Sequence, residues 1–315
     1  MRIRSVELRT TLMINAMYGL VEDRDAPGVG AYLAVRTPAV PDYWYGNCLA
    51  MPRLPAAGEL PLWESLFERE HPSAEHRVFL IDAPEGIGGP SDGEPAATEQ
   101  QASWQAGLAE FAAAGYELSA HDVLATDTIR RPALLNEDFD YRPVRTDEEW
   151  EAVLEASLAI NAGQPGYTRG FLERKFKAIR SAVEGGHGAW WAAWEQRSGG
   201  RVGEPAGGRY AGERRAGERP VANLGLFWSG GLARFQDVET DPDFRRRGIC
   251  RSLVYSACAS ITASGGGAGR GSGSPRPATL FVIKPEDDAV RRIYESVGFS
   301  FLERSVDLCK LIGRA

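Results

Sequence analysis

The sequence contains few cysteines and histidines, and they are not spaced as metal ligands. There are 4 of each among 315 residues, and no CxxC, HExxH or HxxxH pattern occurs, so neither a zinc site nor a disulfide scaffold is expected. No uncharged stretch approaches the ~18 apolar residues of a membrane span, and the charged N-terminus lacks the apolar centre of a signal peptide. We therefore expect no metal, no membrane partner and a cytoplasmic location.

A surplus of basic residues is also missing. Lys and Arg number 36 against 43 Asp and Glu, which gives a formal net charge of −7 and a pI of about 5.4. Domains that bind nucleic acid normally present a basic surface, so no nucleic-acid partner is expected. The content of hydrophobic residues (43%) and charged residues (25%) is typical of a globular protein, and the length predicts roughly two domains.

Glycine is concentrated in three segments without hydrophobic periodicity, 83–101, 195–220 and 264–277. Such segments are typical of surface loops. For residues 201–219 the alternative is a basic regulatory arm. A change of pattern near residues 130–140 marks the expected boundary between two domains, residues 1–135 and residues 136–315.

The pattern of the second half predicts a mixed α/β sheet. Thr146 and Glu149 form a capping-box pattern at the start of a helix, and 278–283 is a continuous apolar run, typical of a strand buried on both faces. The expected order is strand 141–145, helix 146–159, a hairpin of 190–195 and 221–229, strand 233–240, a helix after residue 249, strand 278–283, helix 286–296 and strand 301–311.

A basic turn separates the strand that ends at residue 240 from the next helix. Arg245, Arg246 and Arg247 precede Gly248 there. Backbone N–H groups at a helix N-terminus lack intrahelical partners and carry partial positive charge, and glycine lets a ligand approach the backbone closely. This arrangement is typical of a phosphate or pyrophosphate site. The alternative is a solvated basic turn.

The turn resembles the pyrophosphate loop of the GNAT acetyltransferases, whose pattern is Arg/Gln-x-x-Gly-x-Gly/Ala. Arg245 and Gly248 match it, and Cys250 occupies the final small position. A structural role at the start of the helix is the expected role of Cys250, with a nucleophilic role as the alternative.

A second signature of the family is Asn-x-x-Ala-x-x-x-Tyr-x-x-x-Gly-Phe/Tyr, and residues 287–299 resemble it. Tyr294, Gly298 and Phe299 match, whereas Asp287 replaces the asparagine and Val290 the alanine. Together the two signatures identify residues of about 141–312 as similar to a GNAT domain, an acyl-CoA N-acyltransferase fold.

The resemblance implies that acetyl-CoA is the cosubstrate and lies where two central parallel strands separate. Backbone groups of the strand would pair with the pantetheine arm, and the turn would bind the pyrophosphate. Asp287 in place of asparagine leaves one pantetheine contact open. The implied cofactor-binding residues are Val238, Glu239, Thr240, Arg245, Arg246, Arg247, Gly248, Ile249, Cys250, Arg251, Asp287 and Tyr294.

Transfer of acetyl to an amine needs a proton acceptor for the amine and a proton donor for the leaving thiolate. The resemblance assigns the donor to Tyr294, with packing in the core as the alternative. Glu239 is the first candidate for the base, because strand alternation places it on the same face as Asp237 and two carboxylates raise each other's pKa. A strand-edge carboxylate with no catalytic role is the alternative, and His187 is a weaker candidate.

The first half contains an echo of the second. Residues 76–82 parallel the buried strand 278–283, and residues 104–116 parallel the helix around Tyr294, with Phe111 in place of the tyrosine. A tandem of a degenerate and a cofactor-binding GNAT-like half is therefore predicted; an unrelated α+β domain is the alternative. Residues 44–47 either line the acceptor cleft or pack in the core.

The predicted function is an acetyl-CoA-dependent N-acetyltransferase that acts on a small-molecule or protein amine by direct attack in a ternary complex. The alternative is an acyl-CoA sensor without turnover, which the Asp287 substitution favours. The sequence leaves the acceptor and a homodimer open.

Overall fold

The computed structural model describes residues 1–85, 99–195, 218–264 and 280–312. The chain packs as two units: one comprises Met1–Ala125, Lys284–Glu286 and Phe301–Ala315, and the other Thr126–Ile283 and Asp287–Ser300. The expected boundary between two domains at 135/136 stays a prediction. Most of the three glycine-rich segments, including most of residues 201–219 with their alternative of a basic arm, lies outside the described residues.

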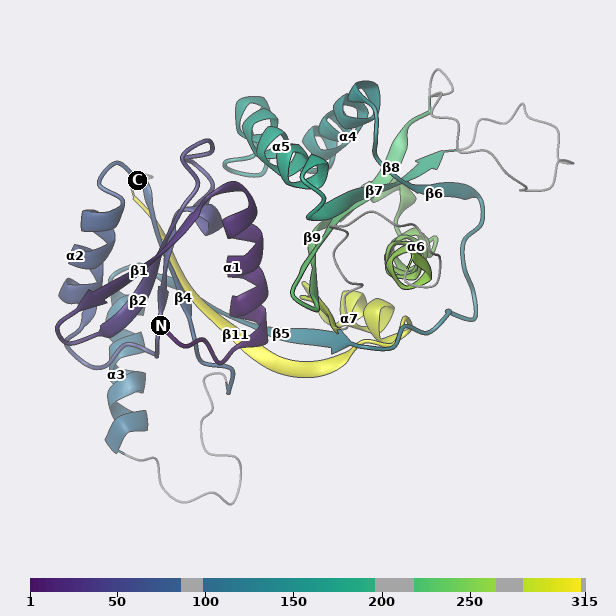
Figure 1. Cartoon of the computed structure of the whole chain (residues 1–315). Coiled ribbons are helices and arrows are strands. Elements are labelled where there is room, and N and C mark those ends of the chain that lie inside the picture. The colour runs from purple at the N-terminus through teal and green to yellow at the C-terminus, as the bar shows by residue number, and fades with distance from the viewer. Residues whose placement is uncertain (86–98, 196–217, 265–279, 313–315) are drawn as a thin grey trace, which may run out of the picture. The chain divides into compact units, whose positions relative to one another are not determined.

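The first unit is a mixed sheet with helices on both faces (Figure 1). Its strands lie in the order β1-β2-β3-β4-β11-β5. Neighbours are antiparallel from β1 to β3, β3 and β4 are parallel, and β4 and β11 are antiparallel. The elements are α1 (Val6–Tyr18), β1 (Leu20–Ala26), β2 (Gly30–Arg36), η1 (Trp44–Gly46), β3 (Cys48–Met51), α2 (Leu60–Glu70), β4 (His76–Ile81), α3 (Glu99–Ala113), β5 (Glu117–Thr126) and β11 (Ser300–Leu311).

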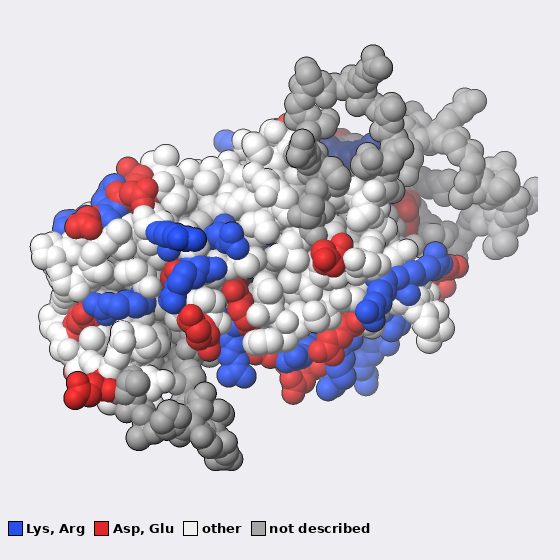
Figure 2. Space-filling view, turned by 60° about the horizontal axis from the view of Figure 1, so that its bottom comes forward, with Lys and Arg blue, Asp and Glu red and all other residues white. Residues whose placement is uncertain are grey.

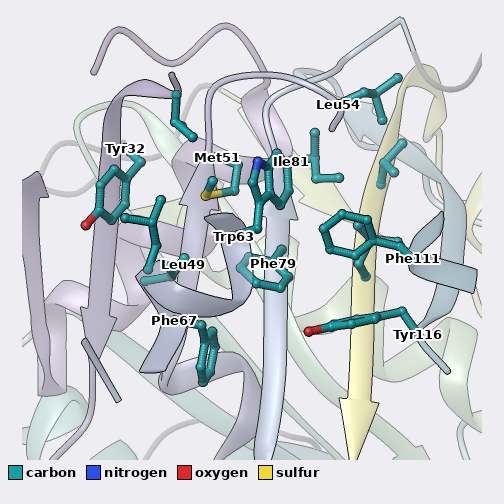
Figure 3. Packing of buried hydrophobic residues seen from close by; sticks show 14 of the residues in the cluster. Tyr32, Leu49, Met51, Leu54, Trp63, Phe67, Phe79, Ile81, Phe111 and Tyr116 are labelled. Atoms are coloured by element: carbon teal, nitrogen blue, oxygen red, sulfur yellow. The ribbon is translucent and has the colours of Figure 1, made fainter. Parts of the chain in front are cut away.

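Alternate residues of these strands face two apolar cores. On one face, Trp63 and Phe67 of α2 and Phe111 of α3 pack around Phe79 of β4 (Figure 3). Leu308 of β11 belongs to the same cluster. Because large aromatic side chains bury much apolar area, this cluster accounts for much of the unit's packing.

The opposite face of the sheet packs against α1, through Leu8 and Leu12. Trp44 and Tyr45 pack against this second core, and the Tyr45 hydroxyl donates to Asp307 Oδ2 at 3.1 Å. Residues 44–47 therefore take the core alternative rather than the cleft alternative.

The second unit has the strand order β10-β9-β8-β7-β6, antiparallel from β6 to β9 and parallel between β9 and β10. In Figure 1, α4 and α5 lie on one face of this sheet and α6 on the other. The capping box predicted at Thr146 and Glu149 is present at the start of α4. The elements are β6 (Phe139–Pro143), α4 (Asp147–Ile160), α5 (Arg169–Glu184), β7 (Gly188–Glu195), β8 (Pro220–Ser229), β9 (Leu232–Thr240), η2 (Pro242–Phe244), α6 (Ile249–Ser264), β10 (Leu280–Ile283) and α7 (Asp288–Glu295).

The order of elements repeats along the chain. Strands β1, β2 and β3 form an antiparallel run, followed by α2, the parallel strand β4, then α3 and β5; strands β7, β8 and β9 are followed in the same way by α6, β10, α7 and β11. The echoes predicted for residues 76–82 and 104–116 correspond to β4 and to α3 with the turn after it. This repetition is what a tandem of two similar halves predicts.

Candidate active site

The basic turn lies between β9 and α6, as the sequence predicts. Asp241 caps the short η2 helix, because its side chain accepts from the Asp243 N–H at 3.0 Å. The chain then reverses through Arg246 (φ 64°) and Gly248 (φ 76°) before α6 begins. A Cβ atom on Gly248 would lie 3.2 Å from a guanidinium nitrogen of Arg251, so a side chain there would be both strained and crowded.

The three arginines of this turn are exposed, and none has a carboxylate partner among the described residues. Arg245 Nε donates to the Thr240 carbonyl at 3.2 Å, and Arg247 Nη2 donates to the Asp243 carbonyl at 3.1 Å. The first turn of α6 contains no acidic residue. The turn therefore presents positive charge and helix N–H groups together, as an anion site requires.

Asn136, which lies ahead of β6, braces the same turn. Its side-chain amide donates to the Arg247 carbonyl at 2.9 Å, and its backbone N–H donates to Ser252 Oγ at 2.8 Å. Ile249 is buried, and burial raises the pKa of the Cys250 thiol to about 12. A neutral thiol is a poor nucleophile, so this geometry favours the structural role of Cys250.

The parallel strands β9 and β10 pair over a short stretch only, from Leu232 opposite Leu280 to Arg234 opposite Val282. β9 then continues to Thr240, whereas β10 ends at Ile283. Beyond residue 234, β9 consequently does not pair with β10. This stretch of β9 includes Val238, Glu239 and Thr240.

Glu239 lies on the face of β9 that packs against α4. Ser157 Oγ donates to its Oε2 at 2.7 Å, and Asn161 Nδ2 donates to its Oε1 at 2.8 Å. Asn223 of β8 donates to Oε2 at 3.2 Å. Three neutral donors thus fix the orientation of the carboxylate.

The pKa of Glu239 is raised above its ordinary value. Burial is the largest cause and the charge of Asp237 the second, whereas the hydrogen bonds from Ser157 and Asn161 and the charge of Lys175 act in the opposite direction. The charge of Asp237 thus acts on the pKa of Glu239 in the direction that the sequence analysis expects. A carboxylate with a raised pKa is better suited to accept a proton near neutral pH.

Tyr294 is buried on α7. Its ring lies 6.3 Å from that of Phe299, which lies 6.1 Å from Phe235, the first residue of β9 beyond the paired stretch. Asp287 caps α7, because its Oδ1 accepts from the Val290 N–H at 2.8 Å. The structure thus gives Asp287 a structural task that the family comparison does not reveal.

Sequence reasoning missed most partners of Glu239. Ser157, Asn161 and Asn223 are separated from it by long stretches of chain and carry no motif. The sequence analysis did not predict α5. Its pattern nevertheless indicates a buried lysine, because Lys175 lies in the same stripe as the buried residues Leu172 and Phe176. A lysine in an apolar stripe at helical spacing points to a buried partner.

No protein-family model and no curated protein sequence matches the chain. It is similar to a solved structure of a functionally unknown conserved protein from Staphylococcus epidermidis, at 11% identity and a TM-score of 0.56, over 93% of this chain and 96% of that one. A GCN5-related N-acetyltransferase from Kribbella flavida matches at 17% identity and a TM-score of 0.53, over 97% and 94%. A tandem GNAT protein from the clavulanic acid biosynthesis pathway matches at 12% identity and a TM-score of 0.50, over 95% and 85%.

The chain has the GNAT fold. In the described part of the chain, no helix combines the length and apolarity needed to cross a membrane, and no group of three or more potential metal ligands occurs. On the face drawn in Figure 2, basic and acidic side chains are interspersed.

Among its described residues, the first unit has no equivalent of the basic turn. At the corresponding place, between β3 and α2, both carboxylate oxygens of Glu110 accept from the Gly58 N–H, at 2.9 and 2.8 Å. Glu59 accepts from the Ala56 N–H at 2.9 Å and pairs with Arg53 at 2.6 Å. The chain's own carboxylates thus occupy N–H groups of this turn, which opposes binding of a second anion.

Proposed function

We propose that the second half is an acetyl-CoA-dependent N-acetyltransferase, and that the first half is a degenerate GNAT-like domain without a cofactor. The observation that carries the proposal is the turn from Arg245 to Arg251. It combines positive charge, a glycine with positive φ and a helix whose first turn contains no acidic residue. It follows a strand whose edge is unpaired by its parallel neighbour.

The residues present fit acetyl-CoA. N–H groups from Arg246 to Arg251 would bind the pyrophosphate, supported by the side chain of Arg245. Backbone groups of Val238, Glu239 and Thr240 would pair with the pantetheine arm at the unpaired edge of β9. Bound there, acetyl-CoA supplies the thioester from which the acetyl group is transferred.

Two side chains of the chain handle the protons. Glu239 accepts a proton from the acceptor amine as its nitrogen bonds to the acetyl carbon. Tyr294 donates a proton to the sulfur as the carbon–sulfur bond breaks. Glu239 thus takes up one proton and Tyr294 releases one. The acceptor is a small-molecule or protein amine.

Calorimetry with acetyl-CoA and an assay of CoA release with a panel of amines test the proposal. We expect binding to the full chain and turnover with at least one amine. Absence of binding would contradict it. Binding without turnover across the panel would instead support the alternative of an acyl-CoA sensor, which Asp287 in place of the asparagine of the GNAT pattern favours.

A further inference from the structure

The strand that carries Glu239 is bulged two residues before it. Asn223 of β8 lies opposite Glu239, but Gly225 lies opposite Gln236, so Leu224 alone faces Asp237 and Val238. Asp237 has a φ of 46°, and among the described non-glycine residues only Arg246 shares a positive φ. Bulges beside active sites re-aim the side chains that follow them.

A buried lysine holds the bulged residue. Lys175 Nζ of α5 lies 2.8 Å from Asp237 Oδ2, and the two side chains are 9% and 25% exposed. A buried ammonium group is costly unless it is paired. This ion pair therefore fixes the side chain of Asp237, and with it the left-handed backbone that an aspartate tolerates better than most residues.

We propose that Lys175 and Asp237 are a positioning pair for Glu239, which holds the bulged backbone ahead of the base and acts on its charge. The inference rests on the proposed acetyl transfer. The positioning pair extends the proposed site by two residues that would not touch the acetyl group.

The groups that face Glu239 come from every element packed against it. Ser157 and Asn161 of α4 and Asn223 of β8 are neutral donors. Asp237 raises the pKa of Glu239 and Lys175 lowers it. Tyr167, whose own pKa burial raises, interacts with Lys175 and both carboxylates. The two members of the pair thus act on the base with opposite signs.

Because Asp237 and Lys175 act on the pKa of Glu239 with opposite signs, the two substitutions should shift the pH profile in opposite directions. A merely structural role does not predict this. The base must be ionised, so turnover rises with pH through the pKa of Glu239. Asp237→Asn removes the group that raises this pKa, and we expect the acidic limb of the kcat profile to move to lower pH by about one unit. Lys175→Met removes the group that lowers it, and we expect a shift to higher pH. The double variant should lie between the two.

Arg180→Gln is the matched control. Arg180 lies on the same helix, but its ion pairs with Asp147 and Glu184 are at the surface, so the profile should not move. The wild-type KM for acetyl-CoA should be kept in Asp237→Asn, because asparagine also tolerates a positive φ.

A second measurement separates this inference from the proposed function. The carboxyl carbon of Glu239 can be titrated by NMR in the full chain with labelled glutamate, assigned by loss of its signal in Glu239→Gln. The expected shifts have the same signs as above and do not require turnover. Unchanged titration in Asp237→Asn, or shifts of one sign in both variants, would overturn the positioning pair, whereas a chain that shows the shifts but no turnover would overturn only the proposed function. If Lys175→Met fails to fold, Asp237→Asn decides alone.

Discussion

At the scale of single residues, Gly248 is the most exacting position of the proposed cofactor turn. Its φ of 76° and the Arg251 guanidinium beside it oppose any side chain, and a carboxylate would also repel phosphate. We expect Gly248→Asp to weaken acetyl-CoA binding by at least about tenfold, or about 1.4 kcal/mol, as measured by calorimetry.

Gly186→Asp is the control for backbone strain. Gly186 has a φ of 80° and open space around its Cβ position, so the same substitution costs similar strain away from the turn. It should leave acetyl-CoA affinity unchanged. If Gly248→Asp bound acetyl-CoA as tightly as the wild type does, the turn would not be part of the cofactor site.

Tyr294 can be tested separately as proton donor and as core residue. Phenylalanine keeps the ring against Phe299 but cannot donate. We expect Tyr294→Phe to lower kcat by about 10²–10⁴-fold, with little change in the KM for acetyl-CoA and little change in Tm. A kcat near wild type, with an acceptor whose chemical step limits turnover, would leave Tyr294 as a packing residue only; Tyr294→Ala should destabilise on either interpretation.

At the scale of elements, α7 begins at Asp287, the residue that replaces the asparagine of the family pattern. Asp287 is its N-cap, and Asn and Asp are comparable caps, whereas alanine costs about 1 kcal/mol. We therefore expect Asp287→Asn to keep the free energy of unfolding nearly unchanged and Asp287→Ala to lower it by about that amount, as measured by urea denaturation. Equal stability of all three proteins would show that the cap contributes nothing.

At the scale of the whole molecule, the last strand of the chain completes the first unit. In β11, Leu308 lies opposite Phe79 of β4 and is fully buried in the aromatic cluster. We expect Leu308→Ala to lower the free energy of unfolding of the first unit by about 2–5 kcal/mol. Hydrogen exchange of the β4 amides under increasing urea measures this free energy of unfolding.

Leu302→Ala is the control on the same strand, because Leu302 is 38% exposed and surface changes cost within about 0.5 kcal/mol. Equal effects of the two variants would contradict the role of β11 in this core. A fragment of residues 136–315 would carry β11 without β4, so binding tests belong to the full chain.

Local rules determined much of this protein from sequence alone. The capping box at Thr146, the hairpin of β7 and β8, and the basic turn before α6 depend on residues close together in the chain, and all are present as predicted. The same holds for the mixed α/β class, because the order of strands and helices limits the ways in which a sheet can be covered. The GNAT fold was expected from the two signatures at residues 245–250 and 287–299.

Only the tertiary structure decided the surroundings of Glu239 and the place of the last strand. Strict alternation placed Asp237 and Glu239 on one face, but the bulge, the lysine beneath it and the donors on α4 and β8 come from distant segments. The pairing of β11 with β4 is likewise non-local. Such contacts depend on which surfaces meet after folding, and a short sequence pattern contains no information about its distant partner.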